Sequence, residues 1–594
     1  MSSKTVASYT LQYQRPLKVM LFGTHPKQFN GYSKVVYELA KGLSEDARIQ
    51  LSIFGFQNMS TNIQHRIDLP DNVDIYDALA NENPKLQGFG IADVSSVVHL
   101  KRPDVIVVYN DLFVICSVIS QLKEIPNRWF KIIAYIDQVY LSQKQEYIKF
   151  VNEHADAALA FTPSWKDCII EQGLSVPCDI LEHGIDPMIN YPVPQALARK
   201  HFNLPEDDFI VLNLNRNQPR KRWDICIKAF AHCVSSLYTD DDTTTNDSVI
   251  LSDDRSARPQ RVLKDPSKPM LKLLIGTSLQ GAWNLLEVYE RELKKRNLTM
   301  THGLKHLLFI DNPQKFTDED INIMYNASDC GINTADGEGV GLCSVEAAVV
   351  GVPQIVPSLG GFKDFFNESC ALMIEPTLAY YVDSARDPVG GEALMCDYRD
   401  FADAIMQYYA DGDLRKRHGQ ASRERILRPH VWKQIASAFA DSLMEKFGDV
   451  VGYVESSTTH EPESEESLDE TMIIPMTDVL EEMPSLDKLP TISEEDLKDL
   501  KDLNEPSTDD GVLSLSEGIG GDDVSVSVSV SVPPAPSAIV QAPRDASSDA
   551  VKTKKPRGLN VKKRKTATAT NRKESMDELL RLRSEIDNLI FKLK

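Results

Sequence analysis

The sequence has few of the features that mark a secreted or zinc-stapled protein. Its 594 residues contain nine cysteines, an odd number, scattered along the chain without a Cys-x-x-Cys pair. Disulfide scaffolds and zinc ribbons need paired cysteines at close spacing, so the pattern argues against both and favours reduced thiols. We therefore expect a cytoplasmic protein without a bound metal.

Long apolar runs are also missing. No stretch approaches the ~20 residues that a helix needs to span a membrane. The N-terminal residues Met1–Ala7 lack the apolar core of a signal peptide. The sequence therefore predicts no membrane span, in line with the expected cytoplasmic location.

Basic residues are in deficit, and most of this deficit lies in one part of the chain. The formal net charge is −22, yet residues 455–523 alone hold 22 Asp or Glu and three Lys. The rest is close to balanced, which argues against charge-driven nucleic-acid binding by the main body. Residues 552–573 hold ten Lys or Arg and no acidic residue, so nucleic acid is a candidate partner for this tail segment alone.

Short apolar runs alternate with longer amphipathic ones through most of the chain. Leu17–Phe22 is typical of a buried strand, and 32–43 has its apolar residues at helical spacing. Prolines interrupt the alternation over 187–206, after which it restarts. Repeated strand–helix alternation predicts parallel sheets covered on both faces. We therefore predict two Rossmann-like α/β domains facing across a cleft, at 15–190 and 191–430.

The remaining segments differ in composition from these two domains. Residues 239–268, inside the second domain, are rich in Asp, Ser, Thr and Pro and predict a disordered insertion. Residues 431–448 have the pattern of a helix, which we expect to pack back on the first domain. Residues 449–574, acidic over 455–523 and basic over 552–573, predict a disordered tail.

The last residues predict a short helix. Ser575 and Glu578 form a capping box, and the apolar residues of 579–593 recur at alternating three- and four-residue steps. Such a short coiled-coil pattern is marginal as an isolated helix. We expect 575–594 to dock on a protein partner or on a second copy of the chain; an amphipathic tail without a partner is the alternative.

Two glutamates separated by seven residues make up the most informative stretch. Residues 338–346 read Glu-Gly-Val-Gly-Leu-Cys-Ser-Val-Glu, between a strand-like run at 330–333 and a small-residue helical pattern at 347–350. A loop entering a helix presents free N–H groups and a positive dipole end. Glu338 and Glu346 suit hydroxyl-rich ligands, because carboxylates accept hydrogen bonds from sugar or ribose hydroxyls. Helix N-terminal charges without a function are the alternative.

Two cations follow the first strand of the second domain. Arg216 and Lys221 lie at the end of that strand, where α/β sheets bind ligands. Cations at this place stabilise the negative charge of a departing diphosphate. The alternative is a basic surface cluster, since Arg220 and Arg222 are also there.

These features together resemble the signature of a known enzyme group. Glu338 to Glu346 resembles the Glu-x7-Glu motif of retaining GT-B glycosyltransferases of the glycosyltransferase family 4 type. Asn215–Arg222 resembles the family's GR…P-x-K loop, and Glu182–Asp186 resembles its NGVD turn before the interdomain linker. Gly31 matches the glycine of its first strand–helix loop, although a tight turn alone would also explain a glycine there.

The resemblance implies a GT-B fold and a metal-independent, retaining hexosyltransferase. The donor substrate would be a nucleoside-diphosphate sugar, no cofactor would be needed, and the acceptor would be a glycan, a lipid or a protein. Arg216 and Lys221 would bind the diphosphate, Gly31 would let the first domain approach the same phosphates, and Glu346 would bind ribose hydroxyls. The donor sugar would be held by Glu338 and by the backbone amides of Gly339, Val340, Gly341 and Leu342.

One position departs from the family. Many relatives carry a His after the strand that here reads Lys131–Ile136, whereas this chain has Asp137. An Asp orients donor or acceptor hydroxyls but cannot replace a neutral imidazole donor, and it also serves as a helix N-cap. We predict Asp137 as a catalytic residue. The departure also keeps an alternative open: a catalytically weak or inactive GT-B protein that binds nucleotide sugar and acts as an interaction or structural protein through its tail.

Overall fold

The computed structural model describes residues 8–13, 15–60, 66–80, 82, 87–240, 261–310, 316–383, 386–427, 429–451 and 453–458. Of the acidic block of the tail, only residues 455–458 are described. The basic block and the helix predicted at 575–594 lie outside the described residues. Among the helices that are described, none is both long and apolar enough to cross a membrane.

The first domain is built on a parallel sheet of seven strands. In spatial order these are β4 (Asp74–Asp77), β3 (Ile49–Phe56), β2 (Leu17–Thr24), β5 (Val105–Asn110), β6 (Lys131–Ile136), β7 (Ala157–Ala160) and β8 (Cys178–Ile180). The helices between them are α1 (Gly31–Ser44), α2 (Val94–Lys101), α3 (Leu112–Leu122), α4 (Gln145–His154) and α5 (Pro163–Glu171).

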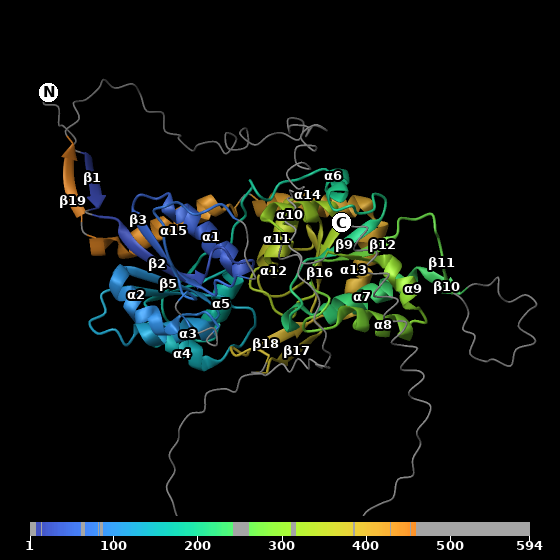
Figure 1. Cartoon of the computed structure of the whole chain (residues 1–594), viewed down its shortest axis with the longest axis horizontal. Helices are drawn as coiled ribbons and strands as arrows, with labels where there is room; N and C mark the ends of the chain where they lie inside the picture. Colours follow the sequence, from blue (N-terminus) through green and yellow to red (C-terminus); the bar gives the residue numbers. More distant parts are fainter. Residues whose placement is uncertain are drawn as a thin grey trace, which may run out of the picture. The chain divides into compact units, whose positions relative to one another are not determined.

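Successive side chains of β2 point to opposite faces of this sheet and enter different apolar clusters. Val19 and Leu21 pack with residues of α1, whereas Met20 and Phe22 pack with residues of α2 and α3. Helices therefore cover both faces, as Figure 1 shows for α1 on one side of the sheet and α2 and α3 on the other. The predicted parallel sheet with two covered faces is confirmed for the first domain.

The second domain repeats the arrangement with six parallel strands. In spatial order these are β13 (Leu307–Phe309), β12 (Leu271–Ile275), β9 (Phe209–Asn213), β14 (Cys330–Ile332), β15 (Gln354–Pro357) and β16 (Ala371–Ile374). Its helices are α6 (Gln195–His201), α7 (Trp223–Ser236), α8 (Leu285–Lys295), α9 (Met300–Gly303), α10 (Asp318–Ala327), α11 (Leu342–Val349), α12 (Phe362–Phe365), α13 (Tyr398–Ala410) and α14 (Gly412–Leu427). Val211 of β9 packs with α7 and α13, and its neighbour Leu212 packs with α10 and α11.

The last long helix among the described residues, α15 (Trp432–Phe447), returns to the first domain and contacts α1. The two helices approach closely at Gly42, where an added Cβ would lie 2.3 Å from the Cβ of Ala436. The chain enters α15 beside the interdomain linker: Ile185 N–H donates to His430 O (2.7 Å) and Trp432 N–H donates to Ile185 O (3.1 Å). The two crossings between the domains are thus hydrogen-bonded to each other.

Two segments predicted to be disordered contain strands. At the base of the insertion 239–268, β10 (Tyr238–Asp240) pairs antiparallel with β11 (Arg261–Leu263). Within the tail 449–574, β19 (Tyr453–Thr458) pairs antiparallel with β1 (Ser8–Tyr13). The disorder predictions are wrong at these places, because composition alone does not reveal which residues pair as strands. Residues 241–260 and 459–594 lie outside the described residues.

The second domain also carries a hairpin that the sequence pattern did not indicate, formed by β17 (Leu378–Tyr381) and β18 (Glu392–Met395).

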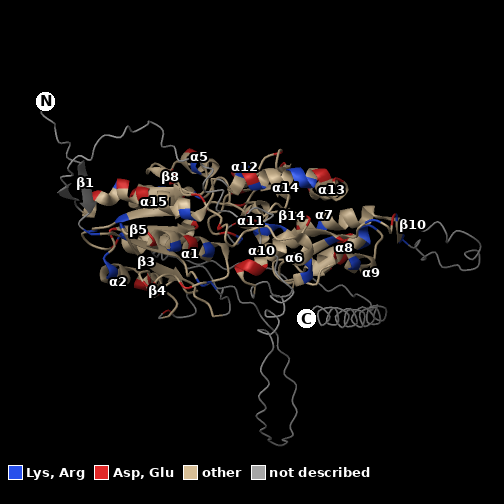
Figure 2. Cartoon of the chain, turned by 90° about the horizontal axis from the view of Figure 1, so that it is seen from above, with Lys and Arg blue, Asp and Glu red and all other residues tan. Residues whose placement is uncertain are grey.

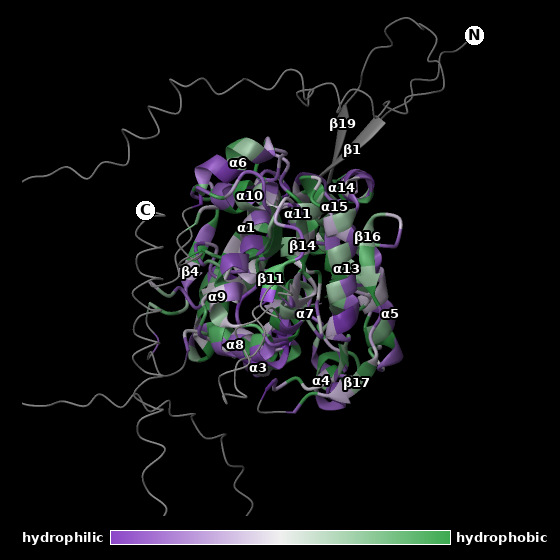
Figure 3. Ribbon diagram, turned by 90° about the vertical axis from the view of Figure 1, so that its right-hand side faces the viewer, coloured by the Kyte–Doolittle hydropathy of each residue, from purple (hydrophilic) through white to green (hydrophobic). Residues whose placement is uncertain are grey.

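Over the described elements, Lys and Arg are interspersed with Asp and Glu (Figure 2). The helices show purple and green stretches side by side (Figure 3), as amphipathic helices that cover a sheet do.

Candidate active site

The starts of two helices, one from each domain, come together at the site. Helix α1 begins at Gly31 after the N-cap Asn30, whose side chain accepts a hydrogen bond from Ser33 N–H (2.8 Å). Helix α11 begins at Leu342 after Gly341. An added Cβ on Gly31 would lie 3.5 Å from Cδ1 of Leu342, so the two helix starts are in contact distance. Helix N-termini attract anions, and two of them at one place favour a phosphate-bearing ligand.

Glu338 is buried, with 4% of its surface exposed, and is surrounded by cations. Its carboxylate forms an ion pair with Arg220 (Nη1–Oε2, 2.5 Å) and a second ion pair with Lys221. Asn333 Nδ2 donates a further hydrogen bond to Oε1 (3.2 Å). Burial opposes ionisation of Glu338, but Lys221 and Arg220 outweigh it and lower the pKa to about 2. Glu338 is therefore a carboxylate at neutral pH.

Of the cations that follow β9, the structure brings three to this carboxylate. Arg216 lies within electrostatic range of Glu338, Arg220 and Tyr32. Arg216 is an exposed residue, and its guanidinium forms no hydrogen bond or ion pair with any residue that the structure describes. Arg216 is thus available for a ligand, whereas Lys221 is shared with Glu338. Sequence reasoning had assigned Arg220 to a possible surface cluster and missed its contact with Glu338, because neighbouring basic residues look alike in a sequence.

The loop between the two glutamates is held against the first domain. Gly339 O accepts a hydrogen bond from Trp165 Nε1 of α5 (2.8 Å). An added Cβ on Gly339 would lie 2.7 Å from Oδ1 of Asp137, so only a glycine allows this approach. Val340 is buried in the apolar cluster that contains residues of both domains. The predicted residues of this loop are therefore placed beside Asp137.

Gly341 is required for both its backbone and its space. It has φ +79°, and an added Cβ would lie 2.2 Å from Cε1 of Phe362. We expect Gly341→Ala to destabilise the protein by about 2–4 kcal/mol, from backbone strain and overpacking together. Gly351→Ala is the matched control, since Gly351 has φ +90° and nothing within 4 Å of the added Cβ. It should cost only the strain, about 1 kcal/mol. Equal losses in urea unfolding would contradict the steric argument.

Glu346 is also buried, and both of its oxygens have partners. Lys34 Nζ from α1 of the first domain lies 2.6 Å from Oε1, and Tyr325 OH donates to Oε2 (2.8 Å). The carboxylate raises the pKa of Lys34 above its ordinary value despite the opposing effect of burial. Glu346 therefore joins the two domains through a buried ion pair, which the sequence did not indicate.

Asp137 follows β6 and lies across from the Glu338 loop. Tyr32 OH, in the first turn of α1, donates a hydrogen bond to its Oδ2. Burial raises the pKa of Asp137, against the opposing effects of the Tyr32 hydrogen bond and of Arg220. Tyr32 was missed by sequence reasoning, and its only signal is its position directly after Gly31. Asp137 and Glu338, predicted from separate motifs, therefore belong to one polar cluster.

The assembled groups are suited to a ligand that carries both phosphates and hydroxyls. Cations and helix starts favour anionic oxygens, and buried carboxylates accept hydrogen bonds from hydroxyls. Within the described part of the chain, no group of His, Cys, Asp and Glu is arranged to hold a metal ion. The nine cysteines are free thiols. One of them, Cys343 in α11, lies within electrostatic range of both glutamates and shares a hydrogen bond with Tyr325, and burial raises the pKa of its thiol.

Two parallel-sheet Rossmann-like domains joined in this way constitute a GT-B fold. Sucrose-phosphate synthase from Thermosynechococcus elongatus is similar with a TM-score of 0.53 and 17% identity, over 73% of this chain and 100% of that one. Anabaena Alr3699/HepE in complex with UDP gives 0.48 and 13%, over 72% and 100% of the two chains. WaaG, a glycosyltransferase involved in lipopolysaccharide biosynthesis, gives 0.46 and 13%, over 71% and 99%. No protein-family model and no curated protein sequence matches the chain. At 17% identity, the likeness to sucrose-phosphate synthase establishes the fold alone.

Proposed function

We propose that the chain is a retaining, metal-independent glycosyltransferase, which moves a hexose from a nucleoside-diphosphate sugar to an acceptor hydroxyl. The observation that carries the proposal is the cluster at Glu338. There a buried carboxylate, two paired cations and the free guanidinium of Arg216 lie beside the start of α11. This combination serves the two parts of one ligand, the diphosphate and the sugar.

In this proposal the diphosphate binds between the starts of α1 and α11, where Gly31 leaves room and Arg216 and Lys221 supply positive charge. Glu338 and the amides of Gly339 to Leu342 hold the donor sugar. Glu346 binds the ribose hydroxyls, in which case they share or replace the hydrogen bonds that Lys34 and Tyr325 make now.

The transfer needs no covalent intermediate on the protein. The bond between the anomeric carbon and the diphosphate oxygen breaks, and its electron pair leaves with the diphosphate. The acceptor oxygen bonds to the anomeric carbon on the same face, and its proton passes to the leaving diphosphate. The cations stabilise the charge that develops on the leaving group, which is the largest contribution that a fixed site makes to such a step. Asp137 orients a hydroxyl of the donor or acceptor.

The test is a thermal-shift screen with UDP, GDP and ADP sugars, followed by transfer and donor-hydrolysis assays with the donor that binds. We expect Arg216→Ala to lower turnover by about 100-fold, because the guanidinium faces the developing charge. Arg399→Ala, which removes an exposed arginine paired with Asp397, should leave turnover unchanged. Undiminished turnover in Arg216→Ala would remove this residue from the mechanism.

A second candidate function is a nucleotide-sugar-binding protein without transfer activity. Asp137 in place of a His favours it, and so does the pairing of both glutamates with the protein's own cations. Calorimetry that finds tight nucleotide binding while no donor is consumed would support this alternative. A partner bound through 575–594, a glycan, lipid or protein acceptor, and a cytoplasmic location remain predictions of the sequence.

A further inference from the structure

A segment of the second domain crosses to the first domain beside the candidate site. We call it the strap: residues 378–383 and 386–395, which include the hairpin strands β17 and β18. Its backbone pairs with the loop after β6, since Glu392 N–H donates to Leu141 O (2.7 Å) and Leu141 N–H donates to Glu392 O (3.2 Å). Lys144 N–H also donates to Val389 O (3.2 Å). The strap is therefore joined by backbone hydrogen bonds to the loop that begins at Asp137.

The strap is anchored inside the first domain as well as on its surface. Val389 is 3% exposed and belongs to the apolar cluster that also contains residues of α3 and β6. Gly391 has φ +117°, and an added Cβ would lie 2.6 Å from Leu141 O. A buried side chain and a glycine-dependent close approach indicate a built contact between the two domains.

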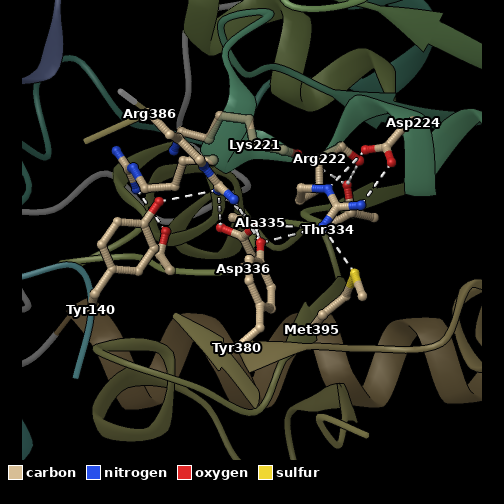
Figure 4. A network of polar contacts seen from close by, with 12 residues as sticks. Tyr140, Lys221, Arg222, Asp224, Thr334, Ala335, Asp336, Tyr380, Arg386 and Met395 are labelled. Carbon is tan, nitrogen blue, oxygen red and sulfur yellow. Dashed lines mark hydrogen bonds and ion pairs between the residues drawn. The ribbon is translucent and has the colours of Figure 1, made fainter. Parts of the chain in front are cut away.

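One guanidinium joins the strap to both domains (Figure 4). Arg386 Nη2 lies 2.7 Å from the carboxylate of Asp336 in the second domain and donates to Tyr140 OH in the first domain (3.2 Å). Its Nη1 donates to Tyr380 OH of the strap itself (2.6 Å). Tyr380 in turn donates to Asp336. Arg386 thus connects a residue three positions after Asp137 with a residue two positions before Glu338.

Asp336 also connects the loop that carries the paired cations. Its N–H donates to Arg220 O (3.1 Å), and its O accepts from Leu394 N–H of the strap (3.0 Å). The Asp336 side chain is fully buried, and Arg222 Nη1 lies 3.5 Å from it. The strap, the Glu338 loop and the 216–222 loop therefore meet at one residue.

We propose that Arg386 is a positioning residue, which holds the strap so that Asp137 of the first domain and Glu338 of the second keep their mutual placement during transfer. This inference rests on the proposed function, and it goes beyond it by assigning a role to a segment outside the donor-binding loops. Transfer depends steeply on such placement, since a displacement of about 1 Å in a site costs on the order of 100-fold in rate. Nucleotide binding depends on it less, because the cations and helix starts that face phosphates lie outside the strap.

The experiment compares Arg386→Ala with Arg386→Lys and with the exposed control Arg399→Ala. Arg386→Ala keeps Arg222 beside Asp336, so the carboxylate retains a counter-charge and the variant should fold. We expect its kcat to fall about 10- to 100-fold, while the donor KM and the Kd for UDP, GDP or ADP, whichever binds, stay within about twofold. Arg386→Lys should recover part of kcat, and Arg399→Ala should match the unaltered protein.

Hydrogen exchange on the protein without ligand gives a second measurement that does not depend on activity. The amides of Glu392 and Leu394 should exchange at least about tenfold faster in Arg386→Ala and at the original rate in Arg399→Ala. A kcat within twofold of the unaltered protein, or unchanged exchange at these two amides, would overturn the assignment. If the unaltered protein transfers no sugar at all, the proposed function fails, and the exchange rates alone decide whether Arg386 holds the strap.

Discussion

Replacing Glu338 with glutamine is expected to lower sugar transfer by about 100- to 1,000-fold while nucleoside-diphosphate binding stays at least as strong. The substitution keeps the shape of the side chain and removes the charge that accepts hydrogen bonds from the sugar. Arg220 and Lys221 then lose their shared counter-charge, so they become free to bind a diphosphate. Steady-state kinetics and calorimetric titration of the nucleotide measure the two effects separately.

The same substitution should reduce stability, because Glu338 is buried and two cations depend on it. Removing one member of a buried ion pair costs about 3–5 kcal/mol, and a hydrogen-bonding amide recovers part of this loss. Glu287→Gln is the matched control, since Glu287 pairs with Arg291 on the exposed face of α8. It should change stability by no more than ~0.5 kcal/mol. Full turnover in Glu338→Gln would show that this carboxylate takes no part in transfer.

The fold followed from local patterns in the sequence. Each strand of a sheet covered on both faces is an apolar run, as in Leu17–Phe22, and each covering helix is amphipathic, as in α1. These signals lie within ten or fifteen residues, so they are visible without knowledge of tertiary contacts. The pair β1–β19 was missed because its two strands lie far apart in the sequence. The strands of β10–β11 and of the strap have only three or four residues each, which is too short to show a period in the sequence.

The candidate site divides along the same line. Glu338 and Lys221 lie on loops at the ends of neighbouring strands, β14 and β9, so a correct topology brings them together. Lys34 and Tyr32 meet their partners across the domain junction, and nothing local to α1 predicts this. Sequence reasoning thus found site residues on loops of both domains, Gly31 and Asp137 included. It missed the contacts of Lys34 and Tyr32, which depend on how the chain packs, and the contact of Arg220 with Glu338.

Replacing Lys34 with methionine is the second substitution with a large expected effect. Methionine keeps an apolar stem and removes the ammonium, so Glu346 loses its ion-pair partner in a buried place. We expect a loss of about 3–5 kcal/mol in the free energy of unfolding, since an unpaired buried carboxylate is left behind. Glu38, which is buried four residues along α1, adds to the loss. Burial raises its pKa to about 7 against the opposing charge of Lys34, so the variant favours its neutral form further.

Urea unfolding of Lys34→Met, Glu346→Gln and the double variant measures the pair as a double-mutant cycle. The expected coupling is at least about 1.5 kcal/mol, and Lys433→Met serves as the control. Lys433 is exposed and lies 3.8 Å from Glu45, so its loss should cost at most ~0.5 kcal/mol.

The nucleotide should raise the stability of Lys34→Met by more than it raises that of the unaltered protein. The reason is that the ribose hydroxyls then meet a carboxylate without a competing ammonium. Zero coupling would mean that Glu346 stabilises the second domain alone. Coupling without any gain in nucleotide binding would place the ribose elsewhere.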